Sequence, residues 1–379
     1  MRKNLTISSV GDISFSTGLE KHSYDFTEWI SKEVREFLKS DIQIGNLECV
    51  FYPEGENRPP EFNLSEKDTS AEAILMSDFN VLSLANNHIC DYFGNKGIEH
   101  TIAILEKHNI NHCGAGINIS EAQKPAILES NGYKIGVFSR IHRNSFENIN
   151  DDIATESNPG AAPLCIREIV KSAKAAKQNF ELDIIILAVH WGIQDLHYHT
   201  SEIHNLADSI SNESEVDFIL GSHSHCIQGI KSDNDKVICY GQGNFYFYPQ
   251  IMDEGILYSE DKDLNRTSII TKINISGTGR SKKIAVKSRV VEQDNRNTVV
   301  FVDKSKERKI LRKVFGIWQN DSPIHFFFEY RLRAIAGDLA KLVDIFKNPV
   351  IRKRFLKLVS NPKALGQKIL TSFFSTKYK

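Results

Sequence analysis

No stretch of this 379-residue sequence reaches about 18 consecutive apolar residues, the length that a membrane-spanning helix needs. The first residues, MRKNLTISSVGD, also lack the apolar core of a secretion signal and pass directly into a strand-like alternation. The six cysteines include no CxxC pair, which argues against a disulfide framework or a zinc ribbon. These absences predict a cytoplasmic protein with reduced thiols.

The formal net charge of −1 conceals an unequal distribution of charge along the chain. Residues 1–300 carry a net charge of −13, whereas residues 301–379 contain 18 lysines and arginines against 6 acidic residues. We therefore expect an acidic body over 1–300, followed by a basic, mainly helical C-terminal extension over 301–379. Because an acidic body repels the phosphate backbone, no nucleic-acid partner is expected.

The extension contains a predicted amphipathic helix between Phe327 and Phe346. Its apolar residues recur at steps of four and three, and basic residues continue among apolar ones from Ile351 to Val359. Two interpretations remain open: the helix packs on its own protein, or it docks on an anionic membrane surface or a partner. Membrane docking would place the protein at the inner face of the membrane.

Apolar runs that suit strands alternate with segments of helical periodicity, which predicts an α/β fold. The predicted strands are Asn4–Val10, Asp41–Leu47, Val81–Leu84, Ile110–Cys113, Lys134–Ser139, Asp183–Val189, Asp217–Leu220 and Lys236–Tyr240, with two more between 267 and 291. The predicted helices are Phe26–Leu38, Ile98–His108, Pro163–Phe180 and Ser201–Ser211. Two polar segments, 52–68 and 144–163, are predicted loops.

Polar side chains follow five of these strands, at or just after the point where each strand ends. They are Asp12; Asn46 and Glu48; Asn87, His88 and Asp91; His190; and His223 with His225. In α/β proteins, ligands bind beyond the carboxyl ends of the strands. For the Asn87 segment alone, a turn that caps the next helix is an equally good explanation. The recurrence at five strand ends favours a functional site.

The residue types in this set indicate a metal site. Carboxylate and amide oxygens with several imidazoles suit borderline divalent metals such as Mn, Fe and Zn. The absence of clustered thiols argues against a structural zinc. A divalent cation held there would activate a water molecule and neutralise charge that develops on a phosphoryl-type oxygen.

The successive motifs of the chain resemble those of a known family. GDISFS, GNLE, LANNHICD, VHWG, GSHSH with Gln228, and YGQGNF resemble the motifs of the CapA family of capsule and poly-gamma-glutamate synthesis proteins, from about residue 5 to 250. That family is similar to calcineurin-like metallophosphoesterases. The resemblance implies a four-layer sandwich of two mixed β-sheets flanked by helices, with two metal ions at the strand ends.

The resemblance also implies a role for each site residue. Asp12 and His225 would hold one metal, Asn87, His190 and His223 the other, and Glu48 would bridge them. His88 would be the general acid, oriented by Asp91, and the substrate pocket would comprise Asn46, Trp191, Gln228 and Asn244. Ser14 departs from the phosphoesterase pattern, which has a histidine there, and Gln194 replaces the usual acidic residue after HWG.

Two functions therefore stand as expectations. The first is a metal-dependent hydrolase that cleaves a phosphoester or a polymer amide bond in capsule, exopolysaccharide or poly-gamma-glutamate biosynthesis. The second is a non-catalytic accessory subunit of surface-polymer assembly or export, which would partner the polymer-synthesis machinery. Ser14 and the basic extension favour the second, and the near-complete ligand set favours the first.

Overall fold

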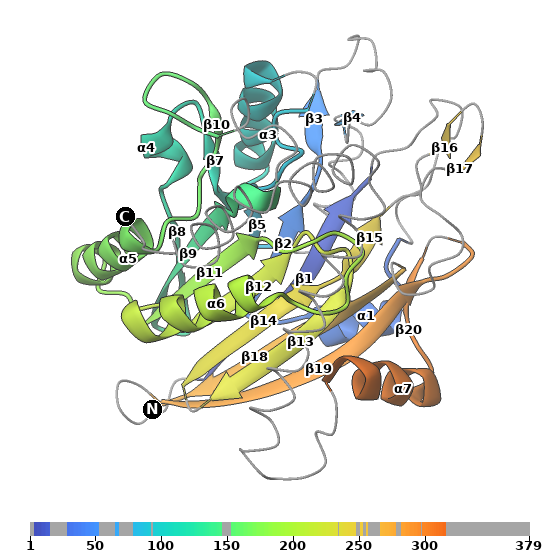
Figure 1. Cartoon of the computed structure of the whole chain (residues 1–379). Helices are drawn as coiled ribbons and strands as arrows, with labels where there is room; N and C mark the ends of the chain where they lie inside the picture. Colours follow the sequence, from blue (N-terminus) through green and yellow to red (C-terminus); the bar gives the residue numbers. More distant parts are fainter. Residues whose placement is uncertain are drawn as a thin grey trace, which may run out of the picture.

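The computed structural model describes residues 4–15, 29–52, 65–67, 79–91, 94–145, 153–233, 235–247, 251–252, 255–256, 266–277, 282–296 and 298–315. This part of the chain is a mixed α/β structure built on two large sheets (Figure 1). Smaller pairs join β3 (Val50–Tyr52) to β4 (Ser65–Lys67), β7 (Ala115–Gly116) to β10 (Gly160–Ala161), and β16 (Ile251–Met252) to β17 (Gly255–Ile256).

The first large sheet has eight strands and begins from the N-terminal strand β1. Its order is β20-β19-β18-β1-β2-β5-β6, and β15 also pairs with β1. The bounds are β1 Asn4–Ser14, β2 Ile42–Leu47, β5 Val81–Ser83, β6 Asn111–Cys113, β15 Asn244–Phe247, β18 Thr267–Ser276, β19 Lys283–Gln293 and β20 Val299–Phe301. The strands β15, β1, β2, β5 and β6 run parallel, so their carboxyl ends meet at one edge.

The second large sheet has six strands in the order β13-β14-β12-β11-β9-β8. The bounds are β8 Ala126–Ser130, β9 Tyr133–Ile141, β11 Ile184–His190, β12 Phe218–Ser222, β13 Ile227–Asp233 and β14 Lys236–Gln242. Strands β9, β11, β12 and β14 are parallel, and the two edge strands are antiparallel to them. Every residue of β11 is buried, as its nearly continuous apolar run predicts.

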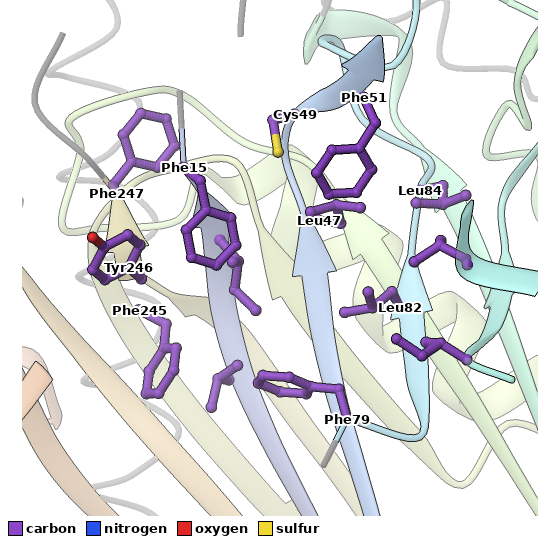
Figure 2. Packing of buried hydrophobic residues seen from close by; sticks show 14 of the residues in the cluster. Phe15, Leu47, Cys49, Phe51, Phe79, Leu82, Leu84, Phe245, Tyr246 and Phe247 are labelled. Atoms are coloured by element: carbon purple, nitrogen blue, oxygen red, sulfur yellow. The ribbon is translucent and has the colours of Figure 1, made fainter. Parts of the chain in front are cut away.

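Three large hydrophobic clusters hold the sheets and helices together. One cluster combines residues of both sheets, for example Ile7 and Ile44 with Ile186 and Phe218, and therefore lies between them. A second packs the helices α1 (Lys32–Leu38) and α3 (Asn95–Lys107) on the eight-stranded sheet. Figure 2 shows part of it, including Phe15, whose ring lies 5.1 Å from that of Tyr246. The third packs α5 (Ile166–Asn179) and α6 (Ser201–Glu213) on the six-stranded sheet.

The predicted helix over Phe26–Leu38 is shorter than expected. Helix α1 begins at Lys32, after the N-cap Ser31, whose side chain accepts a hydrogen bond from Val34 N. Ile30 instead forms a bridge with Val299, a partner far along the chain. Residues 16–28 lie outside the described residues. Helix α5 also begins later than predicted, with Cys165 at its N-cap.

Several elements were missed in the sequence. Strand β1 continues through Asp12, so this carboxylate lies within a paired strand rather than after its end. Strands β8, β13 and β15 were not predicted, and β3, β4 and β10 occupy parts of the two expected loops. The short helix α4 (Ile119–Ala122) and the 3₁₀ turn η3 (Arg143–Ser145) complete the elements up to the extension.

The described part of the extension is the helix α7 (Lys304–Phe315). It packs Ile310 and Val314 into the cluster between the sheets. The predicted helices beyond Phe327 lie outside the described residues. Within the described ranges, no helix is both long enough and apolar enough to cross a membrane.

Candidate metal centre

The predicted site residues come together where the carboxyl ends of the two sheets meet. Register places Asp12 beside Asn46 on one side and beside Asn244 on the other, since β1 pairs with both β2 and β15. In the second sheet His190 pairs with Ser222, the last residue of β12. Parallel pairing therefore brings these polar residues to the same edge, although they are far apart in the sequence.

The turn that follows β12 has a constrained backbone. His223 and His225 have φ values of 85° and 54°, in the left-handed region that non-glycine residues rarely adopt. The turn is held against β14, because a Cβ atom at Gly241 would lie 2.6 Å from Ser224 Oγ and 2.9 Å from Cys226 O. Such strain is characteristic of functional sites, where packing fixes the direction of a side chain.

Glu48 lies at the centre of the cluster. Its side chain is fully buried, and among the described residues its Oε1 atom has no hydrogen-bond partner. The Nε2 atoms of three histidines surround this oxygen at similar distances: His190 at 3.7 Å, His225 at 3.8 Å and His88 at 3.9 Å. A buried carboxylate oxygen without a hydrogen bond is costly unless a cation meets it.

The remaining ligand candidates divide into two groups that share Glu48. In one group, Glu48, His190 and His223 place a potential ligand atom each within 4.8 Å of the others, and in the second Asp12, Glu48 and His225 do the same. The Oδ1 atom of Asn87 lies 2.7 Å from His190 Nε2, which adds an amide oxygen to the first group. The assignment of these groups to two metal ions, which the resemblance implied, stays a prediction.

Burial and neighbouring charges shift the pKa values of several groups in the cluster. Burial, followed by the charges of Asp12 and Asp91, raises the pKa of Glu48 well above its ordinary value. Burial and the neighbouring histidines lower the pKa values of His190 and His223 well below their usual range. Burial lowers the pKa of His225 as well, but the hydrogen bond with Asp12 and the charge of that carboxylate outweigh it and leave the pKa raised.

His88 and Asp91 form a pair at the more open side of the cluster. His88 Nδ1 lies 2.8 Å from Asp91 Oδ2, and the two side chains are 18% and 14% exposed. The pair is thus accessible to solvent, whereas Glu48 and the other three histidines are not. The second ring nitrogen of His88, Nε2, faces Glu48. This geometry is suited to a proton donor whose ring a carboxylate orients.

Asn46, which was predicted to line the substrate pocket, forms hydrogen bonds with both carboxylates of the cluster. It is buried, and its Nδ2 atom donates hydrogen bonds to Asp12 Oδ1 at 2.9 Å and to Glu48 Oε2 at 3.4 Å. Ser83 Oγ donates to its Oδ1 atom at 3.3 Å. Asn46 therefore holds the two carboxylates in place, and its predicted place in a substrate pocket stays a prediction.

The other three predicted pocket residues are buried too. Trp191 belongs to the cluster beneath α5 and α6, and its Nε1 atom donates a hydrogen bond to Tyr240 O at 2.8 Å. Gln228 donates from Nε2 to Leu196 O at 2.8 Å. Asn244 accepts at Oδ1 a hydrogen bond from His225 Nδ1 at 2.8 Å. All three side chains are thus buried and hydrogen-bonded, and their place in a substrate pocket stays a prediction.

Sequence reasoning missed two side chains that shape the site. Ser222 Oγ lies 2.9 Å from His190 Nδ1, and Asn86 accepts a hydrogen bond from His88 N while donating to Leu47 O. Both stand next to a predicted ligand, which was the available signal. A groove of about 690 Å³ at the edge strands β6 and β8 contains none of the site residues.

Comparison with known proteins identifies the family. Residues 6–249 match the family model described as bacterial capsule synthesis protein PGA_cap. The chain belongs to this family. All of the candidate metal ligands lie within the matched residues, and α7 lies outside them.

Two Bacillus relatives are similar to this PGA_cap chain over most of its length. The capsule biosynthesis protein CapA of Bacillus anthracis is 27% identical over 272 residues, which cover 69% of this chain and 63% of that protein. The PGA biosynthesis protein CapA of Bacillus subtilis is 28% identical over 289 residues, covering 73% and 70%. The chain thus spans less than two thirds of the B. anthracis relative. The expected resemblance to CapA proteins is confirmed.

A third relative carries a different description. A probable polyglutamine synthesis accessory protein of Mycobacterium tuberculosis is 26% identical over 224 residues, covering 56% of this chain and 57% of that protein.

Proposed function

We propose that this chain is a metal-dependent hydrolase that acts in capsule, exopolysaccharide or poly-gamma-glutamate biosynthesis. The observation that carries the proposal is the buried Oε1 atom of Glu48, which has no hydrogen-bond partner among the described residues and lies 3.7 to 3.9 Å from three imidazole nitrogens. Metal bonds of about 2.1 Å place neighbouring ligand atoms about 3 to 4 Å apart. The cluster therefore has the spacing of a ligand set.

The donor set fits two divalent ions, of which Mn, Fe and Zn are the best candidates. Asp12 and His225 would hold one ion, Asn87, His190 and His223 the other, and Glu48 would contact both. Bound there, the ions would supply an activated water molecule and neutralise charge on a phosphoryl or carbonyl oxygen. The helices outside each sheet support a further proposal, that the fold is the four-layer sandwich of metallophosphoesterases.

Side chains of the cluster would orient the metal ligands and transfer protons to the substrate. Asp91 accepts from His88 Nδ1, so the ring directs Nε2 toward the cluster, where it can donate a proton to the leaving oxygen or nitrogen. Asn46 fixes the orientation of both carboxyl groups by donating a hydrogen bond to one oxygen of Asp12 and one oxygen of Glu48. The substrate is a phosphoester or an amide-linked polymer unit.

Metal content tests the proposal first. Untagged protein should contain about two equivalents of Mn, Fe or Zn, and His190→Ala and His225→Ala should each lower this content. His108→Ala, a change at the end of α3, is the control and should leave the content unchanged. Absence of metal even after reconstitution would overturn the proposal.

Turnover measurements test the proposed hydrolase activity and the role of His88 as proton donor. Phosphoesters and gamma-glutamyl amides should be screened with metal-loaded protein, and His88→Ala should lower kcat by about 100-fold or more while leaving metal content intact. Unchanged turnover in His88→Ala would contradict the role of the pair with Asp91.

A non-catalytic accessory subunit of polymer assembly is the second candidate. Ser14, which occupies the position of a phosphoesterase histidine, favours it, and so does the accessory role in the name of the M. tuberculosis relative. This candidate would be supported if the protein copurified with a polymer synthase and removal of metal did not change the amount that copurifies. A membrane-surface contact through the extension belongs with this candidate. It predicts that a variant ending at Phe315, which keeps α7 and its packing between the sheets, loses binding to anionic liposomes.

A further inference from the structure

The segment between β14 and β15 crosses from one large sheet to the other directly beside the metal centre. Strand β14 ends at Gln242 in the six-stranded sheet, and β15 begins at Asn244 in the eight-stranded sheet. Only Gly243 separates them, with φ at 75° and a virtual Cβ atom 2.5 Å from Thr267 O. A side chain cannot be accommodated there without a shift of backbone, so the crossing has one conformation.

This crossing contacts both ligands of one half of the centre. Asp12 N donates a hydrogen bond to Gly243 O at 3.0 Å, and Asp12 is the register partner of Asn244. The Asn244 side chain, which is only 4% exposed, reaches His225 Nδ1 at 2.8 Å. The other half is held differently, since His190 has its Nδ1 atom beside Ser222 Oγ at 2.9 Å.

Two hydrogen-bond acceptors lie beside His225 Nδ1. One is the amide oxygen of Asn244, and the other is the Oδ2 atom of Asp12 at 3.5 Å. Two acceptors on the same nitrogen favour the tautomer in which Nδ1 carries the hydrogen. The lone pair is then on Nε2, which faces Glu48 Oε1 at 3.8 Å.

We infer that Asn244 is a positioning residue, which fixes the ring and the tautomer of His225 so that Nε2 serves as ligand in the half of the centre that contains Asp12. The inference deepens the proposed function, on which its metal-binding part rests. Groups behind metal-bound histidines typically contribute about 10- to 100-fold to metal affinity. Asn244 therefore acts through His225 and does not touch substrate.

The first measurement needs no metal. In protein freed of metal and labelled with ¹⁵N-histidine, long-range ¹H–¹⁵N spectra at alkaline pH report the tautomer of each neutral ring, and His225→Gln assigns the signal. Wild-type protein and Asn244→Asp, which keeps an acceptor, should show hydrogen on Nδ1. Asn244→Leu should show a mixture of tautomers, and Ser222→Ala should leave the His225 signal unchanged.

The second measurement is Mn²⁺ titration by calorimetry. Asn244→Leu should weaken one of two equivalents about 10- to 100-fold, Ser222→Ala should weaken the other, and Asn244→Asp should restore binding. A wild-type protein that binds none of Mn²⁺, Fe²⁺ and Zn²⁺ would defeat the proposed function, while the tautomer spectra would still decide the role of Asn244. An unchanged His225 tautomer in Asn244→Leu, or failure of Asn244→Asp to restore it, would overturn the inference.

Discussion

Replacement of Glu48 by glutamine should make the metal-free protein more stable and greatly reduce its stabilisation by metal. The carboxylate is fully buried, its Oε1 atom has no hydrogen-bond partner among the described residues, and a ligand oxygen of Asp12 lies within 4.8 Å. Glutamine has the same shape and no charge. It can also donate a hydrogen bond to the neighbouring carboxylate, which a glutamate cannot do when ionised.

Two estimates give the expected change in the free energy of unfolding for Glu48→Gln. Repulsion between two carboxylates about 4.8 Å apart amounts to about 3.5 kcal/mol at an effective dielectric constant of about 20. Proton linkage gives an upper limit, because keeping a carboxyl with an ordinary pKa of 4.5 protonated at about pH 7.5 costs about 4 kcal/mol. We therefore expect Glu48→Gln to raise the free energy of unfolding by about 1 to 4 kcal/mol in the presence of a chelator.

The pH dependence has a defined sign. Because the pKa of Glu48 is raised in the folded protein, that state binds more protons than the unfolded chain above pH 4.5, and metal-free stability falls as the pH rises through this range. The advantage of Glu48→Gln should thus be near zero at about pH 4.5 and largest at neutral pH.

Urea denaturation with chelator and with Mn²⁺ is the assay. At 100 times its dissociation constant, a metal ion should stabilise wild-type protein by about 2.7 kcal/mol and the variant much less. Glu99→Gln, an exposed change on α3, is the control and should alter stability by less than about 0.5 kcal/mol. A Glu48→Gln protein that is less stable than wild type with chelator, at neutral pH, would refute the reasoning.

Three further changes test the scaffold. Gly221→Ala places a Cβ atom 2.2 Å from Tyr240 O, so we expect a loss of about 3 kcal/mol or more by urea denaturation, and a loss below about 1 kcal/mol would contradict this contact. Trp191→Phe removes the hydrogen bond to Tyr240 O and should destabilise by about 1 to 3 kcal/mol without changing KM; a raised KM would return this residue to the substrate pocket. Burial raises the pKa of Asp41, but hydrogen bonds from Thr6 outweigh it and leave the pKa lowered, so its contribution is present above about pH 4 and lost as the pH falls further. Asp41→Asn should therefore destabilise at pH 7 and have little effect at about pH 2, and an equal effect at both would count against the ionised form.

The chemistry of the centre was predictable because the signals are local. An apolar run that stops abruptly at a carboxylate, amide or imidazole shows the end of a buried strand in a few residues, as at His190 after β11. Parallel strands in α/β proteins place such ends together, and the ligand types then indicate a metal. Each step depends on neighbours in the chain rather than on the folded structure.

The roles of the supporting residues were not predictable in the same way. Asn46, Trp191 and Asn244 all stand next to site motifs, and adjacency alone suggested a pocket. In the structure Asn46 faces two carboxylates, Trp191 packs beneath α5 and α6, and Asn244 bonds to His225. Successive side chains of a strand point to opposite faces, so a shift of one residue reverses the assignment.

The sequence by itself determined the family and most strands of the two sheets, and it supplied the residue types of the candidate metal centre, because periodicity and motifs are properties of short segments. Only the tertiary structure decided where α1 begins. Ile30 forms a β-bridge with Val299, so the helix starts after it, at Lys32. The tertiary structure also decided that the chain changes sheets at Gly243 and so brings Asn244 against His225. Both outcomes depend on pairing between distant strands, and the free energy of such pairing comes from partners that no local pattern specifies.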